Sequence, residues 1–145
     1  MPGRAEAMKT ILVVEDDPFV LSIFRSVLRP KGYAILEATS AEQALKWYGT
    51  QHQIDVIIAD VALPLRSGIQ VASELRRWIP GLQIIFTTGY PPDMWPDLAM
   101  LHEISGAVIR VLQKPFLPKE LLDKIKELIG VSNPITSQRT LAAVR

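Results

Sequence analysis

Acidic, hydroxyl and lysine side chains follow the apolar segments of this sequence, at the point where each segment ends. Residues 15–17 (EDD) follow the first segment and Asp60 ends the third, while residues 87–88 (TT) end the fourth and Lys114 follows the fifth. Carboxylates that meet at one place repel each other, and Mg²⁺ with oxygen ligands relieves that repulsion. A cation, an ammonium group and a hydroxyl also stabilise an incoming phosphoryl group, which a carboxylate can accept as an acyl phosphate.

Five short apolar runs, most of them rich in Ile and Val, predict strands that are buried on both faces. The runs are Thr10–Val14, Ala34–Ala38, Ile54–Asp60, Leu82–Thr88 and Ala107–Leu112. Amphipathic stretches separate them, so the expected fold is a (βα)5 doubly wound parallel sheet in three αβα layers. In the flavodoxin-like order 2-1-3-4-5, strands one and three are neighbours at the switch point. We therefore expect Glu15, Asp16 and Asp60 to meet there.

Helical spacing and helix-boundary residues predict the segments between the strands. Four apolar stripes predict helices over residues 20–28, 41–48, 71–78 and 121–128. The remaining helix, fourth in chain order, lies in a segment with three prolines and is predicted only from about Pro96 to Ile104. Asp17 is expected to cap the first helix, and Ser40 with Gln43 to form a capping box for the second.

Composition and charge exclude several classes of function. The chain has 145 residues, of which 48% are hydrophobic and 21% charged, as in one globular domain. A net charge of +1 gives no electrostatic case for binding nucleic acid. The absence of cysteine excludes disulfides, thiol nucleophiles and cysteine-ligated metals. Because the sequence has neither a membrane-spanning apolar run nor a secretory signal, we expect a cytoplasmic location.

The chain resembles the receiver domain of two-component response regulators in four strings. They are ILVVEDDP (residues 11–18), DVIIADVALPLRSG (55–68), IIFTTGY (84–90) and VLQKPF (111–116). The strings occur in the family's order, each at a strand end. The resemblance implies a CheY-like receiver domain over residues 9–130, with an N-terminal arm at 1–8 and a C-terminal tail at 131–145. We expect a stand-alone receiver domain. The alternative that the chain is a fragment of a longer hybrid protein is left open.

The resemblance implies a metal site around the phosphoacceptor. Asp60 matches the phosphoacceptor, and Glu15 and Asp16 match the acidic pair that holds Mg²⁺ directly or through water. The backbone carbonyl of Ala62 is expected to be a further ligand.

The resemblance also implies which groups contact the phosphoryl oxygens. Thr88, rather than Thr87, matches the switch hydroxyl that precedes a small residue, and Lys114 matches the lysine that pairs with phosphate. The peptide bond between Lys114 and Pro115 is expected to be cis. The family often has Tyr or Phe three residues before this lysine, whereas this chain has Val111.

The function implied is phosphoryl transfer from a histidine kinase or histidine phosphotransfer protein onto Asp60, followed by switching of a protein-interaction surface. The chain would be a signalling phosphoacceptor that catalyses only its own phosphorylation and slow dephosphorylation. Its signal would pass to a downstream protein target or relay partner, with no direct contact to nucleic acid or membrane. A homodimer through the face of the fourth helix, fifth strand and fifth helix is left open.

Two other hypotheses come from different functional classes. The first is a receiver-like interaction module that docks a partner without being phosphorylated. Val111 and the unusual fourth-helix region favour it slightly, whereas the joint presence of the five predicted site residues disfavours it; these are Glu15, Asp16, Asp60, Thr88 and Lys114. The second is a phosphatase on a similar α/β sheet. Phosphatases of the haloacid-dehalogenase type carry a second Asp two residues after their nucleophile, and Ala62 at that position disfavours this hypothesis.

Overall fold

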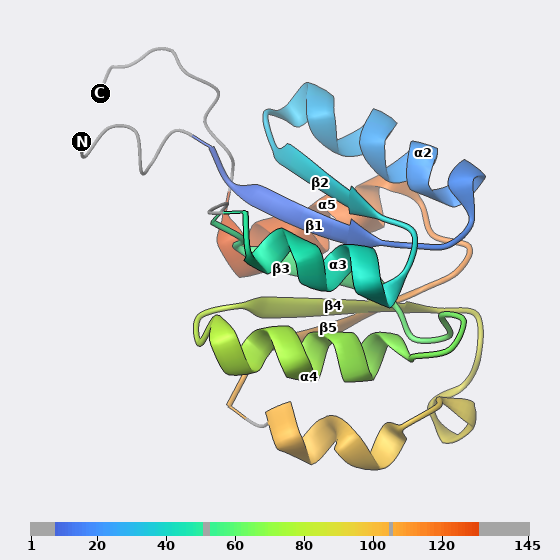
Figure 1. Cartoon of the computed structure of the whole chain (residues 1–145). Coiled ribbons are helices and arrows are strands. Elements are labelled where there is room, and N and C mark those ends of the chain that lie inside the picture. Colours follow the sequence, from blue (N-terminus) through green and yellow to red (C-terminus); the bar gives the residue numbers. More distant parts are fainter. Residues whose placement is uncertain (1–7, 51–52, 105, 131–145) are drawn as a thin grey trace.

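Five parallel strands form one sheet in the order β2-β1-β3-β4-β5, with helices on both faces (Figure 1). The strands are β1 (Thr10–Val14), β2 (Ala34–Ala38), β3 (Val56–Asp60), β4 (Gln83–Thr88) and β5 (Ile109–Gln113). This order confirms the predicted fold class. β1 and β2 have the predicted bounds, whereas β3, β4 and β5 begin one or two residues later than predicted.

The computed structural model describes residues 8–50, 53–104 and 106–130. The arm and tail expected at residues 1–8 and 131–145 therefore lie outside the described residues, except for Met8. Among the helices in the described ranges, none has the length and apolar character needed to span a membrane.

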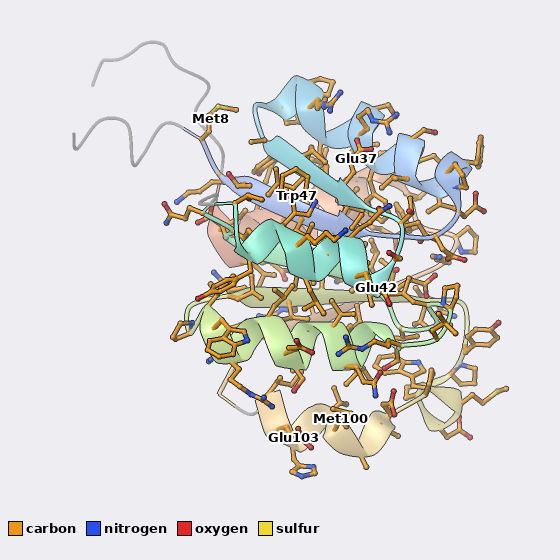
Figure 2. All side chains as sticks on the ribbon, viewed as in Figure 1. Met8, Glu37, Glu42, Trp47, Met100 and Glu103 are labelled. Carbon is orange, nitrogen blue, oxygen red and sulfur yellow. The ribbon has the colours of Figure 1, made fainter. Side chains whose placement is uncertain are left out.

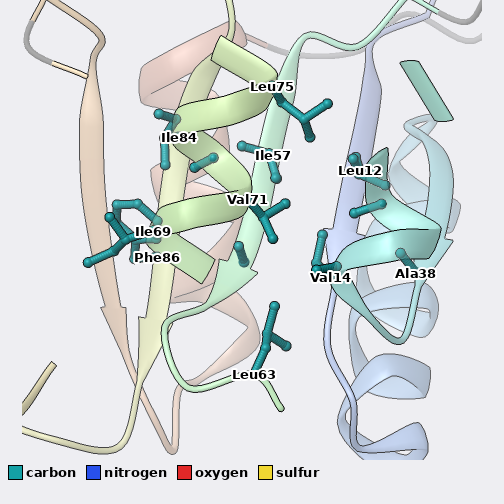
Figure 3. Close-up of a cluster of buried hydrophobic side chains, with 14 of the residues drawn as sticks. Leu12, Val14, Ala38, Ile57, Leu63, Ile69, Val71, Leu75, Ile84 and Phe86 are labelled. Carbon is teal, nitrogen blue, oxygen red and sulfur yellow. The ribbon is translucent and has the colours of Figure 1, made fainter. Parts of the chain in front are cut away.

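The strands are apolar on both faces because helices cover both faces. The α-helices are α2 (Pro18–Leu28), α3 (Ala41–Tyr48), α4 (Gly68–Trp78) and α5 (Pro118–Ile129), and the short helix η1 (Arg29–Lys31) extends α2. One core lies between the sheet and α3 and α4, and a second lies between the sheet and α2 and α5. In the first core, Val71 and Leu75 of α4 lie over Ile57 and Ile84 of the sheet (Figure 3).

Side-chain caps determine where α2 and α3 begin. Asp17 Oδ1 accepts a hydrogen bond of 2.9 Å from the backbone N–H of Phe19, which confirms the predicted cap of α2. Ser40 Oγ accepts one of 3.2 Å from the N–H of Gln43. The side chain of Gln43 accepts from the N–H of Thr39, not from that of Ser40. The predicted capping box is therefore only half formed.

The helix predicted from about Pro96 to Ile104 is present from Leu98 to Ile104, but it is a 3₁₀ helix and not an α-helix. The described residues between β4 and β5 form two 3₁₀ helices, η2 (Pro92–Met94) and η3 (Leu98–Ile104). Asp97 adopts a positive φ of 61° directly before η3, outside the α-helical region, so no helix can include it and the helix begins only at Leu98. η3 packs against α4, and Val111, on the same face of the sheet, is 42% exposed.

Glu37 fastens the edge strand β2 to the helices on both sides of it. Its carboxylate accepts hydrogen bonds from Nε and Nη2 of Arg25 in α2, at 2.6 and 2.7 Å. Its backbone carbonyl accepts a bond of 2.9 Å from Nε1 of Trp47 in α3, which lies beside it (Figure 2). The hydrogen bonds from Arg25 hold the pKa of Glu37 below its ordinary value of 4.5.

This lowered pKa predicts that part of the stability depends on pH. A carboxyl with a lower pKa in the folded state stabilises the protein above its unfolded pKa, and this contribution is lost as pH falls through the folded value. We expect Glu37→Gln to lower the free energy of unfolding at neutral pH, and the deficit to shrink at pH values below 4.5. Urea denaturation of both proteins across that range measures it. A deficit independent of pH would contradict this account, and exposed Glu42→Gln is the control.

Candidate functional site

Three carboxylates meet beyond the carboxyl ends of β1 and β3. Val14 of β1 pairs with Ala59 of β3, so Glu15, directly after β1, and Asp60, the last residue of β3, lie side by side. One ligand oxygen from each of Glu15, Asp16 and Asp60 lies within 4.8 Å of the others. Glu15 and Asp60 are buried, whereas Asp16 is exposed. The structure thus brings together the three acidic residues that the sequence places at this edge of the sheet.

Lys114 lies between two of these carboxylates. Its Nζ donates hydrogen bonds to Oε1 of Glu15 at 2.9 Å and to Oδ2 of Asp60 at 2.8 Å. The N–H of Lys114 donates to the carbonyl of Thr88, and the bond to Pro115 is cis, as expected. Burial is the largest single effect and acts to lower the pKa of Lys114, but its hydrogen bonds and charge interactions with Asp60 and Glu15 together raise the pKa above 10.5. For Glu15 burial dominates and raises the pKa above 4.5, although Lys114 opposes the shift.

The loop after β3 folds back onto Asp60. Oδ1 of Asp60 accepts a hydrogen bond of 2.9 Å from the N–H of Ala62, and Gly68 donates its N–H to the carbonyl of Val61 at 3.2 Å. A Cβ at Gly68 would lie 2.1 Å from the backbone oxygen of Asp60. Glycine is therefore required at this position. The metal role of the Ala62 carbonyl stays a prediction.

Two threonines at the end of β4 have different environments. Thr88 Oγ1 donates a hydrogen bond of 3.0 Å to the carbonyl of Tyr90 and accepts one of 2.9 Å from the N–H of Tyr90. Thr87 pairs with Asp60 in the sheet, and its buried Oγ1 has no hydrogen-bond partner among the residues described. Successive strand residues face opposite sides of a sheet, so the two hydroxyls point to different sides.

The donor set of this site fits a divalent cation with a preference for oxygen. Three ionised carboxylates and one ammonium group leave two net negative charges. The raised pKa of Glu15 shows that Lys114 alone does not offset the burial of this charge. Exposed Asp16 leaves one side open to water, and Mg²⁺ keeps several of its waters when it binds to carboxylates. Glu15, Asp16 and Asp60 are therefore suited to hold Mg²⁺.

The sequence of this chain matches a known protein family. A family model described as the response regulator receiver domain matches residues 11–126. The chain belongs to this family. Receiver domains are signalling phosphoacceptors and not enzymes in the usual sense.

Curated relatives place this receiver domain among proteins of very different lengths. The chemotaxis protein CheY of Halobacterium salinarum is 25% identical over 121 residues, which are 83% of this chain and 97% of that protein. The sensor kinase CckA of Brucella abortus is 31% identical over 83% of this chain, and the regulatory protein PhoP of Bacillus subtilis is 30% identical over the same share. These matches span only 12% of CckA and 48% of PhoP.

Solved structures share the fold of this receiver domain. A CheY-like receiver domain from Methanospirillum hungatei has a TM-score of 0.72 and 28% identity, covering 83% of this chain and 93% of that chain. The response regulator TrrA of Thermotoga maritima, solved in complex with Mg²⁺ and BeF, has a TM-score of 0.70 and 33% identity. That match covers 84% of this chain and all of TrrA.

Two contacts near the site escaped the sequence analysis. Ser67 donates its hydroxyl proton to the carboxylate of Asp97, which joins the start of α4 to the segment before η3. Trp95 packs against the core, and its Nε1 also donates a hydrogen bond to the carbonyl of Tyr90. The cluster of prolines between β4 and β5 was the available signal, because it indicates a segment without helical hydrogen bonds.

Proposed function

We propose that this receiver domain accepts a phosphoryl group from the phosphohistidine of a histidine kinase or phosphotransfer protein onto Asp60, with Mg²⁺ bound. The observation that carries the proposal is the environment of Asp60. Its carboxylate lies between the ammonium group of Lys114 and the N–H of Ala62, and it shares an acidic cluster with Glu15 and Asp16.

The chain's own groups suit an in-line transfer. A carboxylate oxygen of Asp60 attacks phosphorus, an O–P bond forms, and the P–N bond breaks as the partner's imidazole leaves. Lys114, already hydrogen-bonded to Asp60, would stabilise the negative charge on the phosphoryl oxygens. Mg²⁺, held by Glu15, Asp16, Asp60 and the Ala62 carbonyl, would neutralise further charge on those oxygens. The hydroxyl of Thr88 would then donate a hydrogen bond to a phosphoryl oxygen.

The acyl phosphate is proposed to decay slowly. In this family, the residues two after the acceptor and two after the switch hydroxyl flank the path of attacking water, and here they are Ala62 and Tyr90. The methyl group of Ala62 cannot orient water, and Tyr90 would shield the phosphoryl group. The receiver domain is proposed to span residues 9–130 and to be cytoplasmic. It is proposed to pass its signal on by protein contact, with a partner or with a second copy of the chain.

Mass spectrometry of the intact protein tests this function. After incubation with Mg²⁺ and a small acyl phosphate, the wild type is expected to gain about 80 Da, the mass of one phosphoryl group. Asp60→Asn is expected to gain nothing, because an amide is not a nucleophile for this transfer, while the exposed control Asp93→Asn gains the same mass as the wild type.

The outcomes separate the competing functions. A wild type that gains no mass under these conditions supports an interaction module without phosphorylation. A gain that persists in Asp60→Asn assigns the acceptor to another residue. Hydrolysis of a generic phosphate ester that depends on Asp60 would support a phosphatase.

A further inference from the structure

One backbone carbonyl near the site accepts two side-chain hydrogen bonds. The carbonyl oxygen of Tyr90 accepts the hydroxyl proton of Thr88 at 3.0 Å and the indole N–H of Trp95 at 3.0 Å. Tyr90 itself is half exposed, whereas Trp95 is only 8% exposed. A buried tryptophan is thus joined to the switch hydroxyl through one shared acceptor.

The indole of Trp95 is fixed on two sides. Its ring packs edge-on against Phe86 of β4, with centroids 6.2 Å apart. Two residues later, Asp97 accepts the hydroxyl proton of Ser67, and Ser67 directly precedes Gly68, whose backbone lies against Asp60. The segment from Tyr90 to Asp97 is therefore tied to both loops that surround the phosphoacceptor.

The hydrogen bond from Thr88 to the Tyr90 carbonyl is linked to the reaction, because the hydroxyl of Thr88 has a single proton. A hydroxyl has one proton to donate, so Thr88 must release the Tyr90 carbonyl before it can bond to a phosphoryl oxygen on Asp60. Once released, that carbonyl stays paired through Trp95. Two donors on one oxygen also weaken each other's bonds, because each draws on the same electron density. The indole N–H therefore makes the release of Thr88 easier.

We propose that Trp95 is a positioning residue for Thr88, acting through the carbonyl of Tyr90 to free the hydroxyl for the phosphoryl group. The inference rests on the function proposed above. It gives this chain an aromatic residue coupled to the switch hydroxyl from the proline-rich segment after β4. The position on β5 where the family often has Tyr or Phe holds Val111, an aliphatic side chain that is 42% exposed.

A double-mutant cycle tests the coupling. The affinity for beryllofluoride, a mimic of the phosphoryl group, is measured at saturating Mg²⁺ by fluorine NMR of the bound mimic. Trp95→Phe keeps a ring and removes the N–H, and we expect it to weaken the mimic about fivefold, the worth of one hydrogen bond. In a Thr88→Val background, Trp95→Phe is expected to have no further effect, because no hydroxyl remains to be released.

A matched control and a second readout separate positioning from structural damage. Trp47 also donates its indole N–H to a carbonyl, that of Glu37 at 2.9 Å, but Glu37 lies on the edge strand β2, separated from β4 by β1 and β3, so Trp47→Phe should leave the affinity unchanged. In the unmutated protein, the indole proton resonance of Trp95 should shift when the mimic binds. In Thr88→Val, the indole proton resonance of Trp95 should stay unshifted when the mimic binds.

Each outcome bears on a distinct claim. Equal affinity in the wild type and Trp95→Phe overturns the role of Trp95 and leaves the proposed function intact. The same loss in both backgrounds also overturns it, because Trp95 would then act without Thr88. A wild type that does not bind the mimic overturns the proposed function and this inference together.

Discussion

Replacing Lys114 with methionine is expected to lower the free energy of unfolding of the metal-free protein by about 3 kcal/mol. The side chains of Glu15 and Asp60 are only 2% and 12% exposed, and Lys114 bonds to both. Without the ammonium group, two buried carboxylates face each other with no counter-charge, and water cannot solvate them fully. Denaturation by urea in the presence of a chelator measures the loss.

The loss should depend on whatever else can neutralise the site. Millimolar Mg²⁺ is expected to recover stability in Lys114→Met more than in the wild type, because the ion no longer competes with a positive charge. Acidification should also shrink the deficit, since it protonates Glu15, whose pKa burial already raises. Lys119→Met is the control, because its ion pair with Asp123 is largely exposed. Equal losses in the two variants would show that Lys114 does not hold the carboxylates together.

The sequence was sufficient to predict the sheet and the convergence of the acidic residues. Strands covered on both faces have few polar residues until they end, so the first polar groups mark the carboxyl edge. The order of the strands then determines which of those groups are neighbours. This is why the sequence predicts that Glu15 and Asp60, far apart along the chain, lie together, as they do in their shared contact with Lys114.

Local periodicity could not predict the segment between β4 and β5. Its apolar residues have helical spacing, but the positive φ of Asp97 delays the helix until Leu98, and the helix that follows is of the 3₁₀ type. The hydrogen bonds of Thr88 and Trp95 to the Tyr90 carbonyl depend on that irregular path. Bonds between side chains and a loop carbonyl leave no repeating pattern in the sequence.

Replacing Asp16 with asparagine is expected to lower the affinity for Mg²⁺ by at least about tenfold, because one of three charged ligands is lost. The same change should leave the free energy of unfolding of the metal-free protein undiminished. Asp16 is exposed, and its charge adds to the repulsion around Glu15 and Asp60. Calorimetric titration with Mg²⁺ and urea denaturation measure the two effects separately.

The neighbouring residue provides the matched control. Asp17 accepts a hydrogen bond from the N–H of Phe19 and caps α2, so Asp17→Ala should cost about 1 kcal/mol of stability while the affinity for Mg²⁺ is retained. Asp16→Asn would then lose Mg²⁺ affinity without losing stability, and Asp17→Ala would lose stability without losing Mg²⁺ affinity. If Asp17→Ala lost the metal instead and Asp16→Asn kept it, the acidic cluster of Glu15, Asp16 and Asp60 would not be the site that holds the ion. We expect the loss of Mg²⁺ affinity in Asp16→Asn and not in Asp17→Ala because an oxygen of Asp16 lies within 4.8 Å of ligand oxygens of Glu15 and Asp60, whereas Oδ1 of Asp17 is bonded to the start of α2.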